Sequence, residues 1–127
     1  MSQNGIRVAV GQFNELTDQK LRFAVQIGVT GIQMNNPKLP GDCQWEEKDI
    51  RALVDKTAAA GLRLEAIENV PTHFYHRAML GLEGRDEQIA HYCETVRNIG
   101  RAGVPILGLH FMPNSVWRTE KRSPGRG

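Results

Sequence analysis

Apolar residues recur along this chain with helical spacing in three stretches, and each stretch ends in a glycine followed by a strand-like run. A glycine ends a helix readily because it adopts the left-handed backbone conformation. Gly61 follows Gly28 by 33 residues, and Gly103 follows Gly61 by 42 residues. A β-α-β unit needs roughly 30 residues or more, so the spacing predicts repeated β-α units.

Each expected helix carries an apolar stripe at the positions that form one face of a helix. The stripes are Leu21, Ala24, Val25 and Gly28; Ile50, Leu53, Val54 and Thr57; and Ile89, Tyr92, Cys93, Val96 and Gly100. Strand-like runs occupy about residues 6–11, 31–35, 62–67 and 105–111. Strands that alternate with helices in this way predict a parallel sheet.

In each expected strand, one set of alternate residues is aliphatic and the other is mostly small or polar. The aliphatic set is Ile6, Val8, Val10, Ile32, Met34, Leu62, Leu64, Ala66, Leu107, Leu109 and Phe111. An open doubly wound sheet has helices on both faces, so its strands are almost uniformly apolar. A barrel has one helix-covered face and one face that lines a narrow interior with a polar mouth. No glycine-rich phosphate loop follows the first strand, where a dinucleotide fold would have one, so the pattern favours a barrel.

A complete TIM (β/α)8 barrel has eight β-α units in about 250 residues, and this chain of 127 residues supplies three and a half of them. The predicted fold class is α/β, a partial TIM barrel of about the first four strands, all parallel, and three helices. Residues 1–127 are interpreted as the N-terminal half of a barrel domain, with about residues 118–127 as a polar loop or tail. The first and fourth strands are expected to present unpaired edges.

The composition argues against some classes of binding partner. Sixteen Lys and Arg residues against 14 Asp and Glu give a formal charge of +2, which does not suggest nucleic acid or a membrane surface. The chain has neither an apolar run long enough for a bilayer nor the start of a signal peptide. Two cysteines without metal-ligand spacing fit a reducing compartment, so we expect a cytoplasmic protein.

Barrel active sites lie at the carboxyl ends of the strands and in the loops that follow. His110 falls in the inward set at a strand end, where it serves either a site or a structural hydrogen bond. Glu68 ends the third strand, and strict alternation would point it at the helices unless the strand twists there. Asn35 and Asn69 are inward amides at strand ends, suited to ligand contact or to loop capping.

Other polar residues have simpler interpretations. Glu65 faces inward and is expected to pair with Arg63 or another interior cation. Trp117 and Arg118 could close over an anion or pack within their loop. The loop histidines at 73 and 76 lack an evident third ligand, so no metal-binding residue is assigned.

Four segments, residues 28–34, 68–71, 92–103 and 110–117, resemble the N-terminal half of mannonate dehydratase, and the likeness runs from about residue 6 to about residue 118. The resemblance implies a barrel like that of xylose isomerase. It implies a lyase that removes water from D-mannonate to give 2-dehydro-3-deoxy-D-gluconate in hexuronate and glucuronate catabolism, with Mn²⁺ or Fe²⁺ as cofactor. The full-length parent could be a homo-oligomer.

The family's metal ligands, of His, Cys and Asp type, come from later strands, so the resemblance transfers none of them to this chain. It does transfer a wall that contacts or encloses the sugar acid, formed by Glu68, Asn69 and residues 110–117. Within that wall, Glu68 and His110 are the candidates for a catalytic role. The resemblance therefore implies a fragment that is inactive alone.

Two alternatives remain open from the sequence. One is another sugar isomerase or epimerase of the same barrel group, because a shared fold does not fix the reaction. The other is a non-catalytic half-barrel that needs a partner chain.

Overall fold

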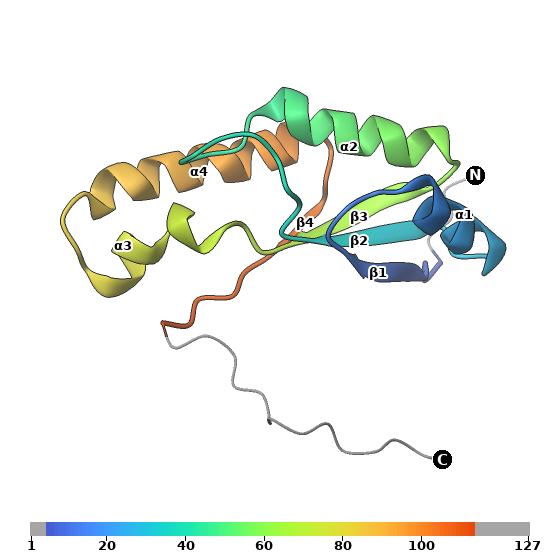
Figure 1. Cartoon of the computed structure of the whole chain (residues 1–127), viewed down its shortest axis with the longest axis horizontal. Coiled ribbons are helices and arrows are strands. Elements are labelled where there is room, and N and C mark those ends of the chain that lie inside the picture. The colour runs from blue at the N-terminus through green and yellow to red at the C-terminus, as the bar shows by residue number, and fades with distance from the viewer. Residues whose placement is uncertain (1–4, 114–127) are drawn as a thin grey trace, which may run out of the picture.

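The computed structural model describes residues 5–113, which form one parallel sheet and the helices that connect its strands (Figure 1). The elements in chain order are β1 (Ala9–Phe13), α1 (Asp18–Gln26), β2 (Gly31–Asn35), α2 (Glu47–Ala59), β3 (Arg63–Glu68), the 3₁₀ helix η1 (Thr72–Phe74), α3 (His76–Leu80), α4 (Arg85–Arg101) and β4 (Ile106–Gly108).

The four strands are all parallel and lie in the order β1-β2-β3-β4. Each strand therefore pairs with the next one along the chain, as in a barrel that winds in one direction. In an open doubly wound sheet the strand order reverses at a switch point. The predicted parallel sheet is confirmed.

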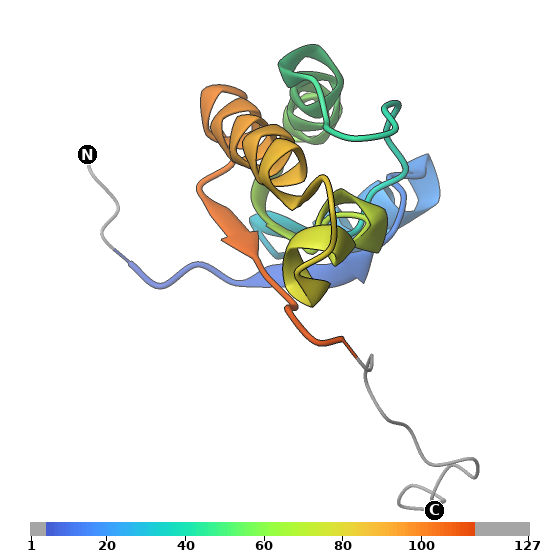
Figure 2. The same ribbon diagram turned by 90° about the vertical axis from the view of Figure 1, so that its left-hand side faces the viewer.

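The long helices cover one face of this sheet. A single core cluster joins helix residues such as Leu21, Ile50 and Ile99 to the strand residues Ile32 and Leu64. Figures 1 and 2 show α2 and α4 side by side over the sheet, with β1 on the far side of the strands from both. The opposite face of the sheet bears no element among residues 5–113, and this one-sided cover confirms the partial barrel.

β3 contains an irregularity that changes which residues face the helices. Ile32 of β2 pairs with Leu64, but the next residue, Gln33, pairs with Ala66, so Glu65 is an extra residue in the ladder. Such a bulge shifts the alternation by one position. Ile67 is consequently buried among the helices, and Glu68 lies on the other face beside Gln33.

The outer strands differ from the expectation. β1 begins at Ala9 rather than near residue 6 and continues to Phe13, and β4 ends at Gly108 rather than near residue 111. Ile6, Val8, Leu109 and Phe111, which belong to the aliphatic set expected to face the helices, are exposed. The physical reason is that each outer strand pairs on one side only, and these residues extend past the paired segment.

The prediction of which face of the third long helix is buried was wrong. Ile89, Cys93 and Val96 are exposed, and the buried residues of α4 are Thr95, Asn98 and Ile99. Thr95 Oγ1 accepts a hydrogen bond from the Trp45 backbone N–H, and Asn98 Nδ2 donates to the Trp45 carbonyl at 2.8 Å. Two polar residues therefore anchor this helix, which an apolar pattern could not indicate. Val25 of α1 is also exposed.

The glycines that were expected to end the three long helices do so. Gly28, Gly61 and Gly103 have φ angles of 77°, 75° and 89°, in the left-handed region that glycine favours. Two short helices, η1 and α3, lie in the loop between β3 and α4, where no helix was predicted.

Candidate functional site

Polar side chains gather at the carboxyl ends of the strands, on the face of the sheet opposite α2 and α4. The carboxyl ends of parallel strands meet at one edge of a sheet, so residues distant in sequence come together there. They line an open hollow of about 580 Å³. Its lining comprises Gln12, Gln33, Ala66, Ile67, Glu68, Asn69, Ile106, Gly108, Leu109 and His110.

A directed chain of hydrogen bonds connects five of these strand-end side chains. Asn69 Nδ2 donates to Asn35 Oδ1 at 3.2 Å, and Asn35 Nδ2 donates to Gln12 Oε1 at 3.1 Å. Gln12 Nε2 then donates to Glu68 Oε2. Gln33 Nε2 donates to the same oxygen at 3.0 Å. Every donation leads toward the Glu68 carboxylate, and both amides that reach it donate to the same oxygen, Oε2.

The backbone at the ends of β2 and β3 fixes this arrangement. Asn36 and Asn69 have positive φ angles of 43° and 63°, a conformation that asparagine tolerates better than most residues. The Asn36 N–H donates to the Glu68 carbonyl at 2.7 Å, and the Asn69 N–H donates to the Gly108 carbonyl at 3.0 Å. The turns that follow β2 and β3 are thus tied to the neighbouring strands.

His110 is held from the loop that follows β3. The Tyr75 hydroxyl donates to the His110 carbonyl at 3.0 Å, and the Tyr75 ring stacks on Phe111 with centroids 6.1 Å apart. Within residues 5–113, the buried atoms His110 Nε2 and Asn69 Oδ1 have no hydrogen-bond partner. Buried polar atoms are nearly always paired, so these two suit a ligand or water.

Glu65 lies toward the opposite end of the strands and has a structural partner. Arg7 Nε and one of its terminal nitrogens donate to the two Glu65 carboxylate oxygens at 2.8 and 3.1 Å, and Arg63 lies 3.6 Å away. The Arg7 hydrogen bond lowers the pKa of the Glu65 carboxyl below its usual value, against a smaller opposing effect of burial. The expectation that Glu65 pairs with a cation is confirmed, and its main partner is Arg7, whose side chain is exposed.

The loop histidines lie elsewhere. His73, His76 and His91 line a separate hollow near Cys43, where His91 Nδ1 is 2.8 Å from Gln44 Oε1. No group of three His, Cys, Asp or Glu side chains in residues 5–113 is arranged to hold a metal ion.

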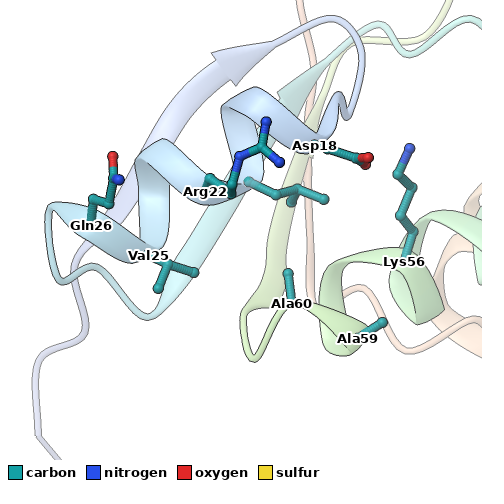
Figure 3. A pocket seen from close by; sticks show the side chains of 8 residues that line it. Asp18, Arg22, Val25, Gln26, Lys56, Ala59 and Ala60 are labelled. Carbon is teal, nitrogen blue, oxygen red and sulfur yellow. The ribbon is translucent and has the colours of Figure 1, made fainter.

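A further hollow, of about 460 Å³, lies between α1 and α2 (Figure 3). Val25, Ala59 and Ala60 form part of its apolar lining, and Arg22 and Lys56 lie at its rim. Barrel chemistry occurs at the strand ends rather than among the outer helices, and none of the sequence-predicted site residues lines this hollow.

Four of the six predicted site residues come together in the structure. Asn35, Glu68, Asn69 and His110 all belong to or border the strand-end hollow, whereas Trp117 and Arg118 lie outside the described residues. Strict alternation would have turned Glu68 toward the helices, and the bulge at Glu65 is what places it in the hollow.

Sequence reasoning gave no role to Gln12 and Gln33, which make the two hydrogen bonds to Glu68. The sequence pattern contained part of the information needed to find these two residues. Gln33 belongs to the polar set of its strand, and Gln12 follows the first predicted strand. What the sequence lacked was the register that brings both amides to one carboxylate.

In the described part of the chain, no helix combines the length and apolar character that a membrane crossing requires.

Sequentially ordered parallel strands, helices on one face and a polar cluster at the strand ends define an α/β protein of the TIM-barrel type. The D-mannonate dehydratase (UxuA) family model matches residues 8–126, and the chain belongs to this family. The resemblance inferred from the sequence is confirmed.

Individual relatives agree. The chain is 37% identical over 90 residues to a mannonate dehydratase of Lactococcus lactis subsp. cremoris and 38% identical over 90 residues to one of Thermotoga petrophila. Each match covers 71% of this chain and 24% of the relative, so the chain spans about a quarter of the length of these curated relatives. The crystal structure of mannonate dehydratase from Streptococcus suis serotype 2 superimposes with a TM-score of 0.69 at 26% identity, covering 82% of this chain and 30% of that one.

Proposed function

We propose that this chain forms one wall of the sugar-acid site of a mannonate dehydratase, a lyase that converts D-mannonate to 2-dehydro-3-deoxy-D-gluconate and water. The observation that carries the proposal is the hydrogen-bonded chain that ends at Glu68, at the strand ends where barrel enzymes bind substrate. Family membership supports the reaction class over that of another sugar isomerase or epimerase. The pathway we assign is hexuronate breakdown in the cytoplasm.

The reaction removes the proton on C2, beside the carboxylate, together with the hydroxyl on C3. It therefore needs a base near C2 and an acid near the leaving hydroxyl. In this wall, Glu68 and His110 are the side chains that can transfer protons, and Asn35 and Asn69 supply amides for hydrogen bonds to hydroxyls. We assign these four residues to substrate binding.

The metal that the family implies, Mn²⁺ or Fe²⁺, does not fit the residues described here. Such ions require several carboxylate or imidazole ligands around one point, and residues 5–113 contain no such group. Glu68 has one oxygen already bonded to two amides. We propose that the metal ligands are supplied by residues outside this segment, and that the 127-residue chain alone does not turn over D-mannonate with Mn²⁺.

A hybrid enzyme tests the proposal. The 90 residues of the Lactococcus lactis mannonate dehydratase that match this chain are replaced with the residues found here, and release of the keto acid from D-mannonate is followed. The hybrid should retain dehydration. Glu68→Gln in the hybrid should lower kcat/KM about ten- to a hundredfold, the cost of losing a hydrogen bond to a charged group.

The matched control is Glu83→Gln, because Glu83 is exposed and does not line the strand-end hollow. It should leave kcat/KM unchanged. An active hybrid that is indifferent to Glu68→Gln would contradict the proposed wall, and turnover by the 127-residue chain alone would contradict the assignment of the metal ligands.

A further inference from the structure

Within residues 5–113, the atoms without a hydrogen-bond partner at the strand-end hollow are mostly acceptors. Both amide donors to Glu68 use Oε2, so Oε1 makes no hydrogen bond within residues 5–113. Asn69 donates its Nδ2 to Asn35, and its buried Oδ1 has no partner in the same range. His110 Nε2, also buried and unpaired there, donates or accepts according to its tautomer.

The orientation of these acceptors is set by their neighbours. Gln12 and Gln33 approach one oxygen of Glu68 from β1 and β2, which leaves the second oxygen available on a carboxylate that cannot rotate freely. The donation to Asn35 fixes which end of the Asn69 amide remains unpaired. Gln12 and Gln33 are in this sense positioning residues for Glu68.

No lysine or arginine lines this hollow in the described part of the chain. Arg7 lies on the same face of the sheet, but it is bonded to Glu65 toward the other end of the strands. A substrate carboxylate has only acceptor oxygens and a negative charge, whereas the atoms it would meet here are two acceptors, one of which belongs to the Glu68 carboxylate. A hydroxyl group carries one donor hydrogen, so two hydroxyls can donate one each to these acceptors.

We propose that this wall binds the hydroxyl-bearing end of the sugar acid, with Glu68 Oε1 and Asn69 Oδ1 accepting from adjacent hydroxyls and the substrate carboxylate pointing away from Glu68. The inference rests on the proposed function, which places a sugar acid here, and adds its orientation. It also predicts that the wall binds a neutral polyol of the same hydroxyl pattern.

The first test uses the whole 127-residue chain and saturation-transfer NMR with D-mannonate and, separately, D-mannitol. Saturation should be larger for the protons on C4 to C6 of D-mannonate than for the proton on C2, because the hydroxyl end lies against the protein. Larger saturation of the C2 proton would overturn the inference while leaving sugar-acid binding intact.

The second test compares dissociation constants for the two ligands in the parent chain and in Glu68→Gln, with Glu83→Gln as control. Loss of the hydroxyl acceptor should weaken both ligands by a similar factor of about ten, the usual effect of losing a hydrogen bond to a charged group. If Glu68 instead faced the substrate carboxylate, neutralising it would strengthen D-mannonate binding and leave D-mannitol unchanged. That result, or unchanged affinity for both ligands, would overturn the inference.

Failure of the proposed function gives a different result. In that case D-mannonate would not shift the side-chain amide resonances of Gln12, Gln33, Asn35 or Asn69 in the parent chain. That result would contradict both the proposed sugar-acid site and the proposed orientation of the substrate. Amide resonances of α4 report whether Glu68→Gln is folded, and the saturation-transfer result on the parent chain does not depend on that variant.

Discussion

Two glutamates of β3, three positions apart, have different environments that follow from their neighbours. Glu65 faces two arginines and Glu68 faces two glutamine amides. The sequence allowed the pairing of Glu65 to be predicted, because an inward charge requires a partner of opposite charge. It did not allow the position of Glu68 to be predicted, because one extra residue in the ladder reverses the direction of the side chains that follow.

The Glu65–Arg7 pair predicts a pH dependence of stability. The Arg7 hydrogen bond lowers the pKa of Glu65 in the folded protein below the reference value of 4.5. A carboxyl with a lowered folded pKa stabilises the protein above its unfolded pKa, and this stabilisation is lost as pH falls through the folded pKa. We expect Glu65→Gln to lose less of its free energy of unfolding than the parent when pH falls from neutral to below about 4, as measured by urea denaturation.

Glu83→Gln serves as the control for this measurement, since Glu83 is exposed and should leave the pH profile unchanged. Glu47 and Glu94 also have pKa values lowered by arginine neighbours, but they remain in both proteins and cancel in the comparison. Identical pH profiles for the parent and Glu65→Gln would mean that the pair contributes nothing to folding.

At the scale of elements, helices were easier to predict than the face that each one buries. Helical spacing and terminal glycines located α1, α2 and α4. The phase of α4 was missed because its inward residues include Thr95 and Asn98, which bind the backbone of Trp45 in the loop before α2. The Trp45 side chain of this loop is buried and packs against Phe74 of η1. The loop before α2 therefore contacts both α4 and η1.

Asn98→Ala should therefore destabilise the protein more than the loss of an exposed asparagine would. Asn98 is 3% exposed, and its loss leaves the buried Trp45 carbonyl without its amide donor. An unsatisfied buried group costs about 1–3 kcal/mol, which urea denaturation would detect. Gln26→Ala, which removes an exposed amide at the end of α1, should change the free energy of unfolding by less than about 0.5 kcal/mol. Equal effects of the two variants would contradict this role for Asn98.

At the scale of the molecule, the sheet is covered on one face, and the outer strands expose apolar residues. Ile6 and Val8 precede or adjoin β1, and Ile106, Leu109 and Phe111 lie in or beyond β4; all are exposed. The parallel strands could be predicted from the sequence because strand-like runs alternate with helical ones. The one-sided cover could be predicted because aliphatic and polar residues alternate within each strand. The extent of the outer strands could not, because it depends on what pairs with their free edges.

Exposed edges of this kind favour self-association, which would also suit the alternative of a half-barrel that needs a partner. We expect the 14.2 kDa chain to elute in size-exclusion chromatography with light scattering above its monomer mass. Ile106→Lys should raise the monomer fraction, because it places a charge on the β4 edge. Leu80→Lys, at an equally exposed site on α3, should not, and a parent chain that is wholly monomeric would contradict the expectation.

The most direct test of the account is a crystal structure of the chain with D-mannonate bound. We predict electron density for the ligand in the strand-end hollow, with hydroxyl oxygens within about 3 Å of Glu68 Oε1 and Asn69 Oδ1. Density confined to the hollow between α1 and α2, or a ligand carboxylate against Glu68, would contradict it.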